Sequence, residues 1–91
     1  LPRPVCEEFL KDHLGNFDLQ ELDPETKNTS RVFFDSGLSL AETARALYVH
    51  RNTLVYRIEK IERQTGRDIR KFDDAMVMKI ALMISDYLKN K

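Results

Sequence analysis

The stretch HRNTLVYRIEKIERQTG, residues 50–66, restricts the fold more than any other, because its aliphatic side chains recur at helical spacing. On a helix, its apolar side would hold Leu54, Ile58, Ile61 and Thr65. The opposite side would hold Asn52, Tyr56, Glu59 and Arg63. We therefore expect a helix over residues 50–65 that buries one side and leaves the other open to solvent or to a partner.

The rest of the chain also predicts helices, since no stretch alternates with the two-residue period of a strand. Caps, prolines and glycines divide it into expected helices over residues 4–14, 24–37, 39–47, 50–65 and 73–89. The apolar face of the first is Val5, Cys6, Phe9, Leu10 and Leu14. The second has polar early turns, so its anchors are Val32, Phe33 and Phe34. We expect an all-α bundle of five to six short helices, with residues 73–89 as its packing spine.

The composition is that of one soluble globular domain, with 42% hydrophobic and 33% charged residues. No apolar run approaches the roughly 20 residues of a membrane span, and no signal peptide is visible. A single cysteine, Cys6, cannot form an internal disulfide, which suits a reducing cytoplasm. The chain opens at LPRP without a methionine, so we expect a C-terminal piece of a longer protein.

The formal net charge of zero hides a polarised distribution. Residues 1–30 hold three basic and seven acidic groups, whereas residues 31–71 hold nine basic and five acidic ones. Residues 72–91 hold three of each. Such a chain can present a basic face to a polyanion, although a solvated surface is the commoner role of any one charged cluster.

Residues 39–65 have the spacing of a helix-turn-helix, in which a tight turn joins a short helix to a longer one. Ser39 and Glu42 form a capping box at the start of the short helix. The helix crossing needs a small residue, and the turn and the second helix each need an apolar one; these are Ala44, Val49 and Leu54. Tyr48 replaces the usual glycine of the turn. If its backbone has a positive φ, the strain is about 1 kcal/mol; otherwise the turn differs slightly.

The outer side of the 50–65 helix divides into residues that would reach bases and residues that would reach phosphates. A recognition helix enters the major groove with its N-terminal residues nearest the base edges. This selects as base contacts His50, Arg51, Asn52, Val55 and Tyr56. Arginine can bond two acceptors of guanine, asparagine can pair with adenine, and a valine methyl can contact that of thymine. The expected phosphate contacts are Ser39, Arg45, Thr53, Arg57 and Lys60.

The run V-H-R-N-T-L-x-Y-R-I-x-x-I-E-x-x-T-G, residues 49–66, resembles the C-terminal DNA-binding domain of the PucR family. These are bacterial transcriptional regulators named for purine catabolism and related to the sugar-diacid regulators. The likeness continues more loosely over residues 31–88, and R-x-T-L at Arg51–Leu54 is also similar to the Fis-type helix-turn-helix. The resemblance implies a cytoplasmic bacterial transcription factor whose sensory domains precede this piece, and which binds double-stranded operator DNA as a homodimer.

Carried over position by position, the family's motif matches His50, Arg51, Asn52, Thr53, Tyr56 and Arg57. The chain departs from the family, which tends to have leucine there, at Thr26, Lys27 and Ser30. We expect residues 1–91 to form one DNA-binding output domain. Its parts would be an N-terminal helix and loop (1–22), a helix-turn-helix core (23–72) and a C-terminal packing helix (73–91).

Several of these residues have an ordinary structural alternative. His50 can cap a helix, Tyr56 can pack on a neighbouring helix, and Arg57 can form an internal ion pair. Glu59 and Arg63 have the i,i+4 spacing of an ion pair within a helix. The alternative function is a helical dimerisation or protein-interaction module that does not read DNA.

The stretch 73–89 is apolar around most of its circumference, more than one face of a small domain would bury. A central core helix and a dimer interface both explain this pattern, and we expect the helix to serve as both. The expected interface residues are Met76, Met78, Ile80, Met83, Ile84 and Tyr87.

Neither an enzyme nor a cofactor or metal site is predicted. The two histidines, His13 and His50, have no cysteine or aspartate at metal-ligand spacing, and three glycines make no phosphate-binding loop. Asp73 and Asp74 stand at a helix start, where a carboxylate pair acts as a cap rather than as an acid and base.

Overall fold

The structure, a computed structural model, describes residues 1–90; Lys91, the last residue of the predicted packing segment, lies outside them. The elements are α1 (Arg3–Leu14), the 3-10 helix η1 (Leu19–Glu21), α2 (Pro24–Asp35), α3 (Leu40–Leu47), α4 (Arg51–Thr65) and α5 (Phe72–Lys89). Residues 1–90 contain no strand. The prediction of an all-α bundle with five to six short helices is confirmed.

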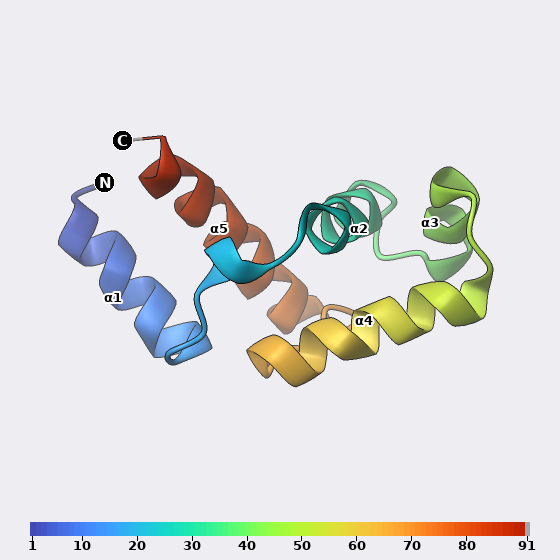
Figure 1. Cartoon of the computed structure of the whole chain (residues 1–91), viewed down its shortest axis with the longest axis horizontal. Coiled ribbons are helices and arrows are strands. Elements are labelled where there is room, and N and C mark those ends of the chain that lie inside the picture. Colours follow the sequence, from blue (N-terminus) through green and yellow to red (C-terminus); the bar gives the residue numbers. More distant parts are fainter. Residues whose placement is uncertain (91) are drawn as a thin grey trace.

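The α5 helix lies between α1 and α2 in an elongated molecule that measures 40 × 23 × 21 Å. It packs against α1 and η1 on one side and against α2 on the other, and α2 in turn contacts α3 and α4. The turn between α3 and α4 lies at the end of the molecule farthest from α1 (Figure 1). The start of α4 therefore projects away from the rest of the fold.

The core runs along the inner side of α4. Leu54, Ile58 and Ile61 are fully buried and belong to one cluster with Phe33 of α2 and Met78 of α5. The apolar side predicted for the 50–65 helix is therefore the buried side. Because Met78 is 0% exposed, it cannot face a second copy of the chain, and its assignment to a dimer interface is wrong.

The α1 helix begins at Arg3 and stops at Gly15, whose φ of 62° is easy for glycine. Cys6 and Leu14 are buried, as the apolar face requires. Val5 is 51% exposed, so its place on that face is wrong. The reason is geometric, since neighbouring helical residues point about 100° apart and Cys6 takes the buried direction.

The early turns of α2 form a helix although they lack large apolar residues. Asp23 caps it by accepting a hydrogen bond of 2.7 Å from the Thr26 N–H, and that bond is the main reason why the pKa of Asp23 lies below its usual value. Thr29 and Ser30 are buried, and their hydroxyls donate to the carbonyls of Glu25 and Thr26. Ser30, a small hydroxyl side chain satisfied within the helix, thus takes one of the positions where the family tends to have leucine.

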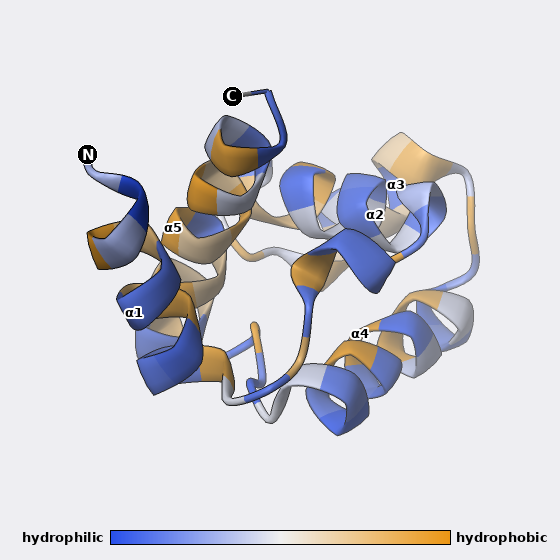
Figure 2. Cartoon of the chain, turned by 60° about the vertical axis from the view of Figure 1, so that its left-hand side comes forward, coloured by the Kyte–Doolittle hydropathy of each residue, from blue (hydrophilic) through white to orange (hydrophobic). Residues whose placement is uncertain are grey.

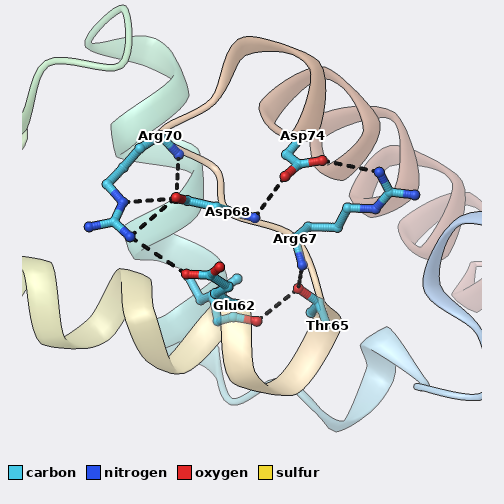
Figure 3. Close-up of polar contacts among 7 residues, drawn as sticks. Glu62, Thr65, Arg67, Asp68, Arg70 and Asp74 are labelled. Carbon is cyan, nitrogen blue, oxygen red and sulfur yellow. Dashed lines mark hydrogen bonds and ion pairs between the residues drawn. The ribbon is translucent and has the colours of Figure 1, made fainter.

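A polar network joins the end of α4, the loop that follows it and the start of α5 (Figure 3). Arg67, in the loop between α4 and α5, donates to the carbonyl of His13 at the end of α1 and to Asp74 of α5. Asp74 also accepts the Asp68 N–H, and Asp68 pairs with Arg70 at 2.8 Å. The predicted capping role of Asp74 is therefore corrected, since its carboxylate binds the preceding loop.

This network predicts a specific sensitivity to acid. The pKa of Asp74 is lowered mainly by the hydrogen bond from the Asp68 N–H, and that of Asp68 mainly by the hydrogen bond from Arg70. A carboxylate whose pKa is lower in the folded chain stabilises the fold above its unfolded pKa of about 3.9 and loses that effect as the pH falls through the folded value. The free energy of unfolding should therefore decrease as the pH falls below about 5.

Urea unfolding at pH 7 and pH 3 measures this effect, with Asp74→Asn as the comparison. The variant should be less stable than the native chain at pH 7, and the two should converge at pH 3. An equal loss of stability on acidification in both proteins would contradict the assignment.

Candidate nucleic-acid interface

The helix-turn-helix consists of α3, the turn at residues 48–50 and α4. At its start, the Ser39 hydroxyl accepts the Glu42 N–H at 3.1 Å, as a capping box requires. The reciprocal half is absent among the described contacts, because the Ser39 N–H donates instead to the carbonyl of Ser36. Thr43 is fully buried and bonds the Ser39 carbonyl, a role that the sequence did not predict.

The turn has the left-handed backbone that glycine usually supplies. Tyr48 has φ 56° and ψ 42°, so its φ is positive and its backbone is strained. The N–H groups of Tyr48 and Val49 donate to the carbonyls of Arg45 and Ala44 and close the end of α3. Val49 packs against the core cluster, while the Tyr48 side chain is 95% exposed.

The first turn of α4 presents polar side chains to solvent. His50 caps the helix, because its Nδ1 accepts the Asn52 N–H at 3.0 Å. This bond requires an unprotonated Nδ1 and leaves Nε2 of the exposed ring as a hydrogen-bond donor. Arg51, Asn52 and Thr53 are exposed, and their side chains form no hydrogen bond or ion pair with any other described residue. They are available to a partner.

The middle of α4 carries an aromatic and cationic pair. The Arg63 guanidinium lies 5.6 Å from the centre of the Tyr56 ring, which is 61% exposed. Tyr56 is therefore not packed on a neighbouring helix. Among the ion pairs of residues 1–90, none joins Glu59 to Arg63, so that predicted pairing is wrong. Val55, the residue before Tyr56, is half-buried.

Two of the predicted phosphate contacts, Arg57 and Lys60, form ion pairs with acidic residues at the start of α2. Arg57 is 3.5 Å from the Glu25 carboxylate, and its side chain is 23% exposed. Lys60 is 3.7 Å from Asp23. The internal ion pair considered for Arg57 is thus present. Both acidic partners are at least half exposed, so these are weak surface contacts.

Only some of the predicted DNA contacts therefore lie close together in the structure. His50, Arg51, Asn52 and Thr53 share the exposed first turn of α4, and Arg45 is exposed in the last turn of α3 next to it. Ser39 stands at the other end of α3. Sequence reasoning missed Asp23 and Glu25 as neighbours of the basic side chains, and no sequence signal links residues more than thirty positions apart.

Residues 1–90 contain no group of three or more His, Cys, Asp or Glu side chains that could hold a metal ion. No helix in the same range is both long and apolar enough to cross a bilayer. A hollow of about 570 Å³ lies between α1, η1 and the end of α5, and none of the predicted DNA contacts lines it.

Comparison with known proteins agrees with this geometry. Residues 27–84 match the family model of the PucR C-terminal helix-turn-helix domain. The purine catabolism regulatory protein of Bacillus subtilis (strain 168) is 36% identical over 83 residues, which are 90% of this chain and 16% of that protein. The carbohydrate diacid regulator of Escherichia coli (strain K12) is 35% identical over 60 residues, 66% of this chain and 16% of that protein.

A solved structure extends the similarity to the fold. The crystal structure of a regulator of polyketide synthase expression from Bifidobacterium adolescentis superposes with a TM-score of 0.75 at 33% identity. The match covers 92% of this chain and 33% of that one. The chain thus spans about a sixth of the length of the two named curated relatives.

Proposed function

Because the chain belongs to the family of PucR C-terminal helix-turn-helix domains, we propose that it binds duplex DNA sequence-specifically as the output module of a bacterial transcriptional regulator. The family is one of transcriptional regulators and not of enzymes. One observation carries the proposal, namely that the first turn of α4 projects from one end of the molecule with exposed side chains free of internal partners. This is the part of a recognition helix that meets base edges in the major groove.

The proposed base contacts follow from the donors that this turn offers. Arg51 presents a fork suited to the two acceptors of guanine, and Asn52 has the donor and acceptor pair that matches adenine. His50 offers its Nε2 donor, since Nδ1 is used by the cap. Val55 and Tyr56 would meet the groove one turn later, where the half-buried valine methyls suit a thymine methyl.

Phosphate contacts would hold α3 and α4 in register on the duplex. Arg45 and Thr53 are exposed, and Ser39 lies at the start of α3. Arg57 and Lys60 would exchange their carboxylate partners on α2 for phosphates. Such an exchange is inexpensive because pairs at 3.5 and 3.7 Å with exposed carboxylates contribute little to stability.

The proposal also concerns the longer regulator of which this domain would be a part. The relatives are about six times longer than the matched segment, so we propose that residues 1–91 form one output domain behind sensory domains of a cytoplasmic regulator. Within it, residues 1–22 and 73–91 would support the helix-turn-helix core of residues 23–72.

A homodimer would form through the outer side of α5. Phe72, Met76, Ile80, Met83 and Tyr87 are between 41% and 70% exposed and fall within one side of the helix. Hydrophobic residues colour most turns of this helix (Figure 2). Phe72 and Met76 also line an apolar groove of about 360 Å³ with Phe34 and Leu38. A stripe of this length is unusual on a monomer surface.

The spacing along α5 favours a second copy as the occupant. Positions 76, 80, 83 and 87 are separated by four, three and four residues, so the order reads the same in both directions. Two antiparallel α5 helices would place Met76 against Tyr87 and Ile80 against Met83 in both halves of a two-fold interface. Ile84 is half-buried and would contribute from the edge of this stripe.

The apolar stripe equally supports the alternative function, a protein-interaction module without DNA reading. Salt dependence separates the two. Three cationic phosphate contacts in each bound copy, from Arg45, Arg57 and Lys60, predict that log affinity falls with log salt at a slope of about −2.7 per copy. Affinity of one copy for a random-sequence duplex should then drop roughly 40-fold between 50 and 200 mM salt. Fluorescence anisotropy measures this, and a protein without salt-dependent affinity would favour the alternative.

A further inference from the structure

Tyr48 has a conformation and an exposure that the fold does not explain. Five described residues have a positive φ, and three of them are glycines, Gly15, Gly37 and Gly66. The fourth, Leu38, is partly buried and packs against the core, which offsets its strain. Tyr48 has the same backbone strain, yet its side chain is 95% exposed and gains almost no packing. A glycine at this position would suit the isolated domain better.

The position of Tyr48 is next to the surface proposed to meet DNA. It is the C-cap of α3, and His50, two residues later, is the N-cap of α4. Two peptide units span at most about 7.6 Å, so the Tyr48 backbone lies within that distance of the recognition helix. In a helix-turn-helix the first helix crosses the sugar-phosphate backbone while the second enters the groove. Tyr48 lies in the turn that joins these two helices.

We propose that Tyr48 is a DNA contact, whose hydroxyl donates a hydrogen bond to a phosphate oxygen at the edge of the groove that α4 enters. Tyrosine is among the side chains that bind phosphates in this way. The inference rests on the proposed DNA-binding function and adds to it a residue that positions the recognition helix. The contact carries no charge and reads no base, so it affects every duplex alike.

Two substitutions test the contact. Tyr48→Gly removes the side chain and the backbone strain, so the melting temperature should not fall and should rise by up to about 4 °C. Tyr48→Phe removes the hydroxyl alone. Both variants should bind a duplex enriched from a random pool, and a random-sequence duplex, about 3- to 10-fold more weakly than the native chain. The preference between the two duplexes and the salt slope should stay unchanged.

Asn16→Ala serves as the control, because it removes an exposed polar side chain from the loop after α1, away from the α3–α4 turn and outside the α5 stripe. It should bind DNA as the native chain does. Native affinity in either Tyr48 variant would overturn the contact, and would leave an exposed ring for a protein partner. Absence of DNA binding by the native chain would instead refute the proposed function, so the two failures are distinguishable.

Discussion

Replacing Arg51 or Asn52 with alanine should weaken binding to the preferred duplex roughly 5- to 150-fold while leaving the fold intact. Each side chain is exposed and forms no hydrogen bond or ion pair with another described residue, so its removal creates no buried cavity and breaks no internal bond. A bidentate contact to one base discriminates by about 1–3 kcal/mol, which sets the size of the loss. Affinity for random duplexes should fall much less, since most of that affinity comes from phosphate contacts.

Arg3→Ala provides a control of equal charge change for Arg51→Ala. Arg3 is an exposed residue at the start of α1, at the opposite end of the molecule from the α3–α4 turn. Anisotropy titrations of both duplexes, with circular dichroism melts, measure affinity and stability together. Equal losses on preferred and random duplexes for both substitutions would show that Arg51 and Asn52 do not read bases.

Met83→Asp should weaken dimerisation at least about 30-fold. Met83 is 63% exposed near the middle of the α5 stripe, so a carboxylate there costs the monomer little. In the antiparallel pairing it would face Ile80 of the second copy, and a charge would be buried without a partner. Central apolar residues of this kind carry most of the energy of an interface.

Val5→Asp is the matched control, because Val5 is 51% exposed on α1 and lies outside the stripe. Sedimentation velocity over a range of concentrations should show dimers for the native chain and for Val5→Asp, and monomers for Met83→Asp. A native chain that stays monomeric at every concentration reached, or equal effects of both substitutions, would contradict an interface on α5.

Helix positions could be predicted closely because their signals are local. Asp23 followed by proline, the Ser39 cap and Gly66 each act within one turn, and α2, α3 and α4 begin and end within about two residues of the expected bounds. The buried side of α4 followed from spacing alone, since a helix with one apolar side has one way to face a core. The turn was predicted, and the strain at Tyr48 was predicted on the condition that its φ is positive, which the structure meets.

The contacts between helices could not be predicted in the same way. Met78 and Met83 look alike in a helix that is apolar nearly all round, so the pattern does not say which one faces the core. The pairing of Arg57 with Glu25 joins residues of two different helices, and depends on how α2 crosses α4. The same holds for Arg67, which links the end of α1 to the start of α5 through one side chain.

The central claim is that the exposed first turn of α4 reads base sequence, and the most direct test is the ratio of two affinities. Duplexes are enriched from a random pool by the chain itself, and the enriched sequence and a shuffled version of it are titrated at the same salt concentration. We expect a preference of at least about 1000-fold for the enriched duplex, which falls sharply when Arg51 or Asn52 is replaced. Failure to enrich any sequence, or a preference that survives both substitutions, would contradict the claim.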